Sequence, residues 1–120
     1  MKRLLILLAV LTMGLQGASA QSDYYMRQAQ SYQRDAEYYM KQAQGYDRDV
    51  EYYQRQAQGY MRDAEYYTRQ NNTDKARTYQ RWASEAMDKA NLRMRWANEA
   101  REKAQLRMKW AQDAMDKARR

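Results

Sequence analysis

Tyrosine is the side chain of this sequence with the widest chemical use, and it recurs at a fixed spacing. Three copies of a fourteen-residue unit fill residues 23–64, as in EYYMKQAQGYDRDV at 37–50, and EYYTRQ at 65–70 begins a fourth. A second array with the same period fills residues 81–120 and is marked by Trp82, Trp96 and Trp110. A regular series of rings can pack in a core, stack on a ligand or form an interface. The spacing of the rings indicates which of these roles they have.

Catalytic chemistry has little support among the other side chains. The sequence contains no histidine and no cysteine, and Ser22, Ser31 and Ser84 have no recognisable base to activate them. Most carboxylates lie four residues before a Lys or Arg, the spacing of helical ion pairs, and no glycine-rich phosphate loop is present. We therefore expect no enzyme activity, no cofactor and no metal site.

The period of fourteen equals two heptads, the repeat of helices that supercoil around each other. With Tyr25 at heptad position d, every a and d position up to residue 67 is filled consistently. We expect these residues to pack helix against helix, together with five residues of the second array. The predicted packing residues are Tyr25, Ala29, Tyr32, Ala36, Tyr39, Ala43, Tyr46, Val50, Tyr53, Ala57, Tyr60, Ala64, Tyr67, Trp82, Met94, Trp96, Met108 and Trp110.

Two more rows of the first array lie outside a two-helix seam. Two helices cannot bury the c and d tyrosines, the methionines and the tryptophans together, so the c row is a candidate oligomer interface. The f row is basic at all seven places, which either keeps the helix soluble or forms an edge for a polyanion. The c row holds Tyr24, Tyr38, Tyr52 and Tyr66, and the f row holds Arg27, Arg34, Lys41, Arg48, Arg55, Arg62 and Arg69.

The only strong break in the helical pattern is NNTD at residues 71–74. Asn71 or Asn72 can take the left-handed conformation that ends a helix, and Thr73 or Asp74 can cap the next one. We therefore predict an all-α fold, an antiparallel two-helix coiled-coil hairpin with helices at 21–70 and 75–120. One continuous helix that assembles between chains is the alternative.

Folding the hairpin about residue 72 predicts which residues face each other. Gly45 and Gly59 come near Trp96 and Trp82, and we expect these glycines to make room for the indoles, since glycine in a helix interior has a cost. The same geometry predicts ion pairs of Asp49 with Arg93 and of Asp35 with Arg107.

Residues 1–20 have the pattern of a secretory signal peptide. Lys2 and Arg3 precede an apolar run, and Ala18-Ser19-Ala20 is a small-x-small cleavage site. We expect cleavage after Ala20 and a periplasmic or extracellular location. In the remaining chain, residues 21–70 have seven basic and eight acidic side chains, and residues 71–120 have thirteen and seven.

These patterns favour an exported, non-enzymatic structural protein that forms homo-oligomers. An adaptor for an anionic envelope polymer such as polysaccharide, lipopolysaccharide or DNA is one alternative, although nucleic acid is poorly supported because the rings are committed to packing. An amphipathic membrane-surface protein is another. The alanine seam is similar to that of bacterial alanine-zipper envelope lipoproteins. The resemblance is architectural only, because their lipid-anchoring cysteine is missing and the aromatic content differs.

Overall fold

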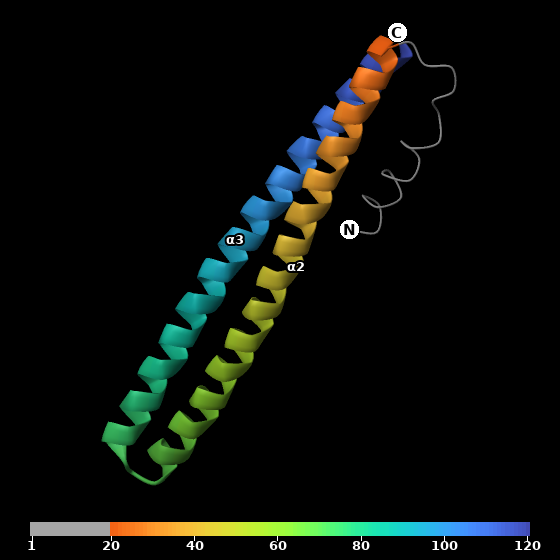
Figure 1. The fold of residues 1–120 in the computed structure, drawn as a ribbon. Helices are drawn as coiled ribbons and strands as arrows, with labels where there is room; N and C mark the ends of the chain where they lie inside the picture. Colours follow the sequence, from red (N-terminus) through yellow and green to blue (C-terminus); the bar gives the residue numbers. More distant parts are fainter. Residues whose placement is uncertain (1–19) are drawn as a thin grey trace. The chain divides into compact units, whose positions relative to one another are not determined.

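Two long helices make up almost all of the part of the chain that the structure describes, residues 20–120. In the computed structural model α2 spans Ala20–Arg69 and α3 spans Thr73–Arg119 (Figure 1). No strand occurs in residues 20–120. The predicted signal peptide lies outside the described residues except for Ala20, where α2 begins.

The helices are long because their sequences contain almost nothing that interrupts a helix. Proline is absent from the chain, and Gly45 and Gly59 are the only glycines within α2 and α3. Each helix also has charges that suit its dipole. Asp23 and Asp74 lie in the first turns, while Arg69, Lys117 and Arg119 lie in the last turns.

The end of α2 is a hydrogen-bonded turn built on Asn71. This residue has a φ of 58°, in the left-handed region that asparagine enters more readily than most residues. Its N–H donates to the Thr68 carbonyl at 3.1 Å, and the Asn72 N–H donates to the Tyr67 carbonyl at 2.9 Å. This Schellman pair satisfies carbonyls that a helix end leaves free. The chain therefore reverses here, and the prediction of a helical hairpin is confirmed.

The cap of α3 is Asn72, so the prediction of Thr73 or Asp74 in this role was wrong. The Asn72 side-chain oxygen accepts a hydrogen bond from the Lys75 N–H at 3.2 Å, and its carbonyl accepts one from the Ala76 N–H at 3.1 Å. Asparagine is one of the best N-capping residues. Because Asn71 and Asn72 divide the two tasks, the turn needs only residues 70–72.

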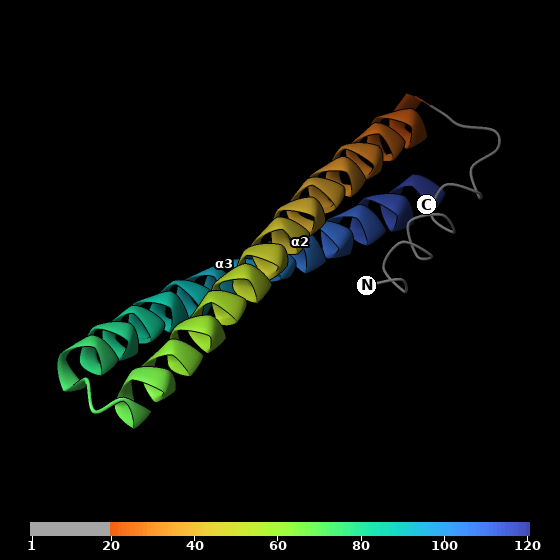
Figure 2. The same ribbon diagram turned by 90° about the horizontal axis from the view of Figure 1, so that it is seen from below.

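The described residues form two compact units. The turn unit comprises residues 42–100, and the end unit comprises residues 20–41 and 101–120. In the turn unit α2 and α3 run antiparallel and side by side away from the turn (Figures 1 and 2).

Alanine forms nearly all of the buried seam between the helices. Of the seventeen buried hydrophobic residues among residues 20–120, fifteen are alanines. In the turn unit they are Ala43, Ala57 and Ala64 of α2, with Val50, and Ala76, Ala83, Ala86, Ala90, Ala97 and Ala100 of α3. In the end unit Ala29 and Ala36 face the second helix, which contributes Ala104, Ala111, Ala114, Ala118 and Met115. Small side chains let helix backbones approach closely, so larger residues are left on either side of the seam.

A larger side chain in the seam should force the helices apart. Ala90 is fully buried, and we expect Ala90→Leu to lower the free energy of unfolding by about 1–3 kcal/mol, the usual cost of overpacking. Asn91→Leu is the control, since Asn91 is exposed. Urea denaturation followed by circular dichroism measures both variants. Equal stability of the two would show that the seam is not closely packed.

Candidate interaction surface

The d-row tyrosines lie beside the seam, half-buried, and every second one meets a tryptophan of α3 edge to face. In the turn unit Tyr46 and Trp96 have ring centroids 5.6 Å apart, and Tyr60 and Trp82 are 5.7 Å apart. The end unit repeats the contact between Tyr32 and Trp110 at 5.6 Å. Such edge-to-face pairs add to the energy of burial alone. We call the side of the seam that carries these rings the aromatic flank.

Two arginines of α3 tie the aromatic flank to acidic residues of α2. Arg93 Nε lies 3.5 Å from Asp49 Oδ2, and its guanidinium lies 4.5 Å from the Trp96 ring centroid. This ion pair was predicted from sequence, as was that of Arg107 with Asp35, which measures 3.8 Å in the end unit. Both arginine side chains are mostly covered by neighbouring residues. Each also stacks on an indole, Arg93 on Trp96 and Arg107 on Trp110, and the two sites are fourteen residues apart. Each arginine therefore joins an ion pair to an aromatic stack.

A row of lysines covers the remaining d-row tyrosines, and sequence reasoning missed it. The ammonium groups lie 5.1–5.8 Å from the ring centroids, within the range of cation–π attraction. The signal was present in the sequence, since these lysines also recur every fourteen residues. The pairs are Lys75 with Tyr67 and Lys89 with Tyr53 in the turn unit, and Lys103 with Tyr39 and Lys117 with Tyr25 in the end unit.

Next to the turn, Tyr79 lies fourteen residues before Arg93. A tyrosine thus occupies the position at which the repeat would place an arginine. Its ring stacks on Tyr67, with centroids 5.4 Å apart and planes 7° apart, and meets Trp82 edge to face at 5.1 Å. Burial raises the pKa of the Tyr79 hydroxyl above its ordinary value, and the neighbouring Tyr67 and Asp63 raise it further. At the turn end of the aromatic flank, the Tyr79 ring therefore packs between Tyr67 and Trp82.

The prediction that Gly45 and Gly59 make room for the indoles was wrong. A Cβ atom added at either glycine would meet no heavy atom within 4 Å. The indoles instead contact the tyrosines that follow the glycines, Tyr46 and Tyr60. Position c points further out than position d, so packing inside the hairpin does not require these glycines.

The four c-row tyrosines are the most exposed aromatic residues of the described chain. Their exposed fractions are 55–58%, and each ring lies edge to face against the next residue, a d-row tyrosine, at 5.1–5.4 Å. Gln28 and Gln56 donate side-chain hydrogen bonds to the hydroxyls of Tyr24 and Tyr52. The rings therefore stand in defined positions while most of each face is open to solvent.

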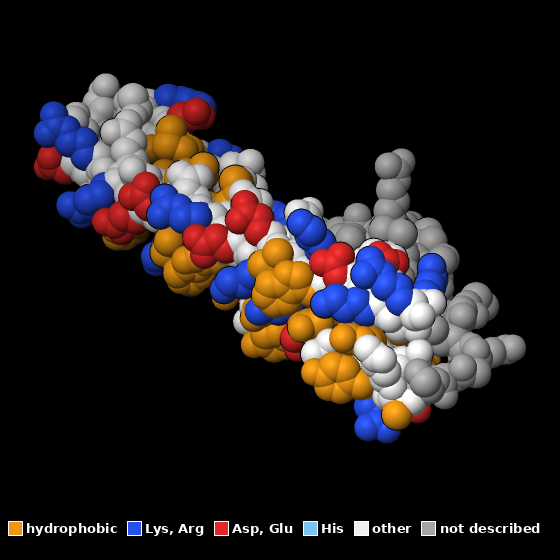
Figure 3. Space-filling view, turned by 90° about the horizontal axis from the view of Figure 1, so that it is seen from above, with side chains coloured by type: hydrophobic (Ala, Val, Ile, Leu, Met, Phe, Trp, Pro, Cys, Tyr) orange, Lys and Arg blue, Asp and Glu red, His pale blue; other side chains and the backbone are white. Residues whose placement is uncertain are grey.

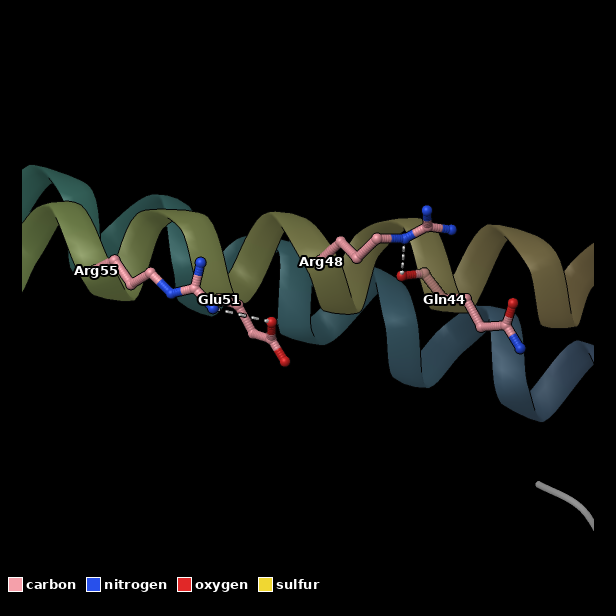
Figure 4. Close-up of polar contacts among 4 residues, drawn as sticks. All are labelled: Gln44, Arg48, Glu51 and Arg55. Atoms are coloured by element: carbon pink, nitrogen blue, oxygen red, sulfur yellow. Dashed lines mark hydrogen bonds and ion pairs between the residues drawn. The ribbon is translucent and has the colours of Figure 1, made fainter.

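The basic f row is less uniform than its sequence indicates. Arg55 and Arg69 form ion pairs with Glu51 and Glu65 at 3.7 and 3.6 Å, as their spacing predicts. Arg48 instead donates to the Gln44 carbonyl at 3.4 Å (Figure 4). Glutamate and glutamine alternate four residues before the f row from residue 37 onward, so only every second basic residue has an acidic side chain at that spacing.

The opposite side of the seam carries methionine and glutamine. In the turn unit an open groove runs over Ala57 and Ala83, with Met61, Met87 and Gln54 among its walls. Met61 and Met87 remain well exposed, as does Met94. In the end unit Met115 is buried and Met108 is half-buried against it. We call this side the methionine flank.

Exposed hydrophobic side chains gather in patches between charged ones on the face that Figure 3 shows. Within residues 20–120 no group of three or more acidic side chains is placed to hold a metal ion. Over the same residues neither helix has a stretch long and apolar enough to cross a membrane. Comparison of the chain with protein-family models, curated proteins and solved structures finds no significant match.

The open space beside the glycines generates a stability prediction. Gly45→Ala and Gly59→Ala should each raise the free energy of unfolding by about 0.5–1 kcal/mol, because alanine favours helix and meets no obstacle. Thermal unfolding at low protein concentration measures the change. Ala43→Gly, in the seam of the same helix, should lower stability. If the glycine variants are instead less stable than the wild type, Gly45 and Gly59 are needed for packing within the hairpin after all.

Proposed function

We propose that this chain is an exported, non-enzymatic structural protein whose coiled-coil hairpins self-associate through their exposed aromatic and methionine side chains. The proposal rests on the difference in size between the side chains that the hairpin buries and those that it leaves exposed. The hairpin buries alanines, while Tyr24, Tyr38, Tyr52 and Tyr66 and several Trp and Met side chains stay more than a third exposed.

The energetics of burial favour this reading over a hairpin that acts alone. Hydrophobic burial stabilises by about 25 cal/mol per Å² of apolar surface, and alanine offers little surface. An aromatic side chain can bury about 150–250 Å². Most of that gain is unused on a lone hairpin, and a second hairpin covers it with more of the same rings and thioethers. Patches of exposed apolar surface usually mark an interaction site.

The basic f row supports an adaptor for an anionic polymer less well. Arg55 and Arg69 already have acidic partners, and α2 as a whole has seven basic and eight acidic residues. A helix whose charges nearly cancel attracts a polyanion weakly. The same balance weakens the proposal that α2 lies on a membrane surface, for which a strongly basic polar face is typical.

Export is part of the proposal and rests on residues 1–20. The basic start, the apolar run and the Ala18-Ser19-Ala20 site suit signal peptidase. Protein recovered from the compartment outside the cytoplasmic membrane should begin at Gln21 by amino-terminal sequencing. An uncleaved chain that stays in the cytoplasm would contradict both the cleavage and the location.

Light scattering tests self-association. We expect the purified protein to show an oligomer mass that rises with protein concentration and does not fall in high salt, because apolar contacts are not screened. Replacing Tyr24, Tyr38, Tyr52 and Tyr66 with glutamine, a good helix former, should weaken the oligomer and leave the helical content unchanged.

The matched control changes the other exposed row of α2. Glutamine at Arg34, Arg48 and Arg62 should leave the oligomer mass unchanged, although it removes three positive charges from the same helix. A wild-type monomer that binds anionic polymer or anionic vesicles, and is released by salt, would overturn self-association in favour of an adaptor or a membrane-surface protein.

A further inference from the structure

The tyrosines of the c row alternate along α2 with small residues at the same heptad position, and nothing inside the hairpin explains the small ones. Within the turn unit position c holds Gly45, Tyr52, Gly59 and Tyr66. The tyrosines are exposed, and the space where each glycine side chain would stand is open. A glycine within a helix costs about 1 kcal/mol relative to alanine. An alternation that weakens the lone hairpin is therefore accounted for better by a partner that approaches the glycines.

We propose that the partner is a second copy of this chain, docked α2 against α2 in antiparallel orientation. In the turn unit Tyr52 lies over the partner's Gly59, and Tyr66 lies over the partner's Gly45. A twofold axis between residues 55 and 56 makes each contact occur twice, as in other closed dimers. The inference rests on the proposed self-association and names the surface that performs it.

The direction follows from the alternation. In a parallel pair without stagger, tyrosine would face tyrosine and glycine would face glycine, which leaves clashes and gaps in turn. The antiparallel pair places every ring of this stretch on a bare helix backbone. Glycine permits such close approach because it has no side chain. When the second copy runs in the opposite direction, each tyrosine of this stretch therefore faces a glycine and each glycine faces a tyrosine.

The tyrosines are already held in position for this contact. The Tyr52 ring packs edge to face on Tyr53 at 5.3 Å, and its hydroxyl accepts a hydrogen bond from Gln56 at 3.0 Å. Tyr66 packs in the same way on Tyr67 at 5.1 Å. Since these contacts restrict the rings before binding, the loss of side-chain freedom on docking is smaller.

Charge favours α2 over α3 as the face that meets its own copy. From residue 42 to its end, α2 has four basic and five acidic side chains, whereas α3 up to residue 100 has six and four. The net charges of two α2 faces therefore add little repulsion. In an antiparallel pair the two basic f rows do lie along the same side and repel each other, so salt should leave the dimer unchanged or strengthen it.

Large side chains at the two glycines, where the partner's rings would dock, test the contact. The variant with both Gly45→Leu and Gly59→Leu should fold, because each glycine faces open space. Its dimer should dissociate at about tenfold higher concentration or more, the consequence of overpacking at the interface. Gln44→Leu, an exposed site of α2 outside the c row, is the matched control and should leave the dimer intact. Circular dichroism verifies the fold of both variants.

Single cysteines test the direction, since the natural chain contains none. Under mild oxidation Gln56→Cys, beside the twofold axis, should form a disulfide-linked dimer. Tyr66→Cys should not, because the two copies of residue 66 would lie about 30 Å apart along the helices. Linkage of Tyr66→Cys together with failure of Gln56→Cys would overturn the antiparallel arrangement.

The two proposals fail in different ways. If the leucine variant keeps the full wild-type oligomer mass, self-association uses another surface, such as the methionine flank, and only the tyrosine-on-glycine contact is overturned. If the wild-type protein is a monomer at every concentration, the proposed function and this inference both fail. A dimer that weakens with leucine but not with Gln44→Leu, and links through residue 56, establishes both.

Discussion

The close approach of two helices along a line of alanines is the constraint on which the rest of the structure depends. Ala43, Ala90 and Ala97 are completely buried, and side chains of this size leave no space in the seam of the turn unit for a ring or a thioether. The rings and the methionines of the turn unit therefore stand beside the seam or outside it. Tyrosine, tryptophan and arginine take one flank, and methionine and glutamine take the other. A seam of leucine would bury more apolar surface within the hairpin and leave less for a partner.

The aromatic flank shows how a shared period produces a repeated contact. Both helices repeat every fourteen residues, so an antiparallel pairing that places Tyr46 against Trp96 also places Tyr60 against Trp82. The arginine and lysine contacts follow the same interval. Cation–π and edge-to-face contacts are individually modest. A shift by one heptad would offer the tryptophans and lysines other d-row tyrosines, but it would place Arg93 and Arg107 opposite glutamines instead of Asp49 and Asp35. The ion pairs therefore oppose sliding of one helix along the other. A seam made of alanine alone would define the register poorly.

The exposed rows raise a different question, that of specificity. Exposed tyrosines alone would promote contact with many surfaces. Alternation with glycine restricts the contact to surfaces that offer a gap at the same interval, and a reversed copy of the same helix does so. The two glycines lower the stability of the hairpin while they define what can dock on it. On this view the period of fourteen, rather than seven, belongs to the interface between copies and to the aromatic flank, and the seam needs only the heptad.

The sequence by itself determined the helices, their reversal near residue 72 and the ion pairs of Asp49 with Arg93 and of Asp35 with Arg107, because heptad spacing and antiparallel pairing are properties of position along the chain. It also located the exposed tyrosine row. Only the tertiary structure decided that Gly45 and Gly59 do not accommodate the indoles, since a difference of one residue between facing positions transfers the indole from the glycine to the next tyrosine. It also decided that Asn72 caps α3 and that Tyr79 stacks on Tyr67. Those choices depend on side-chain directions and hydrogen-bond geometry, which a one-dimensional pattern does not contain.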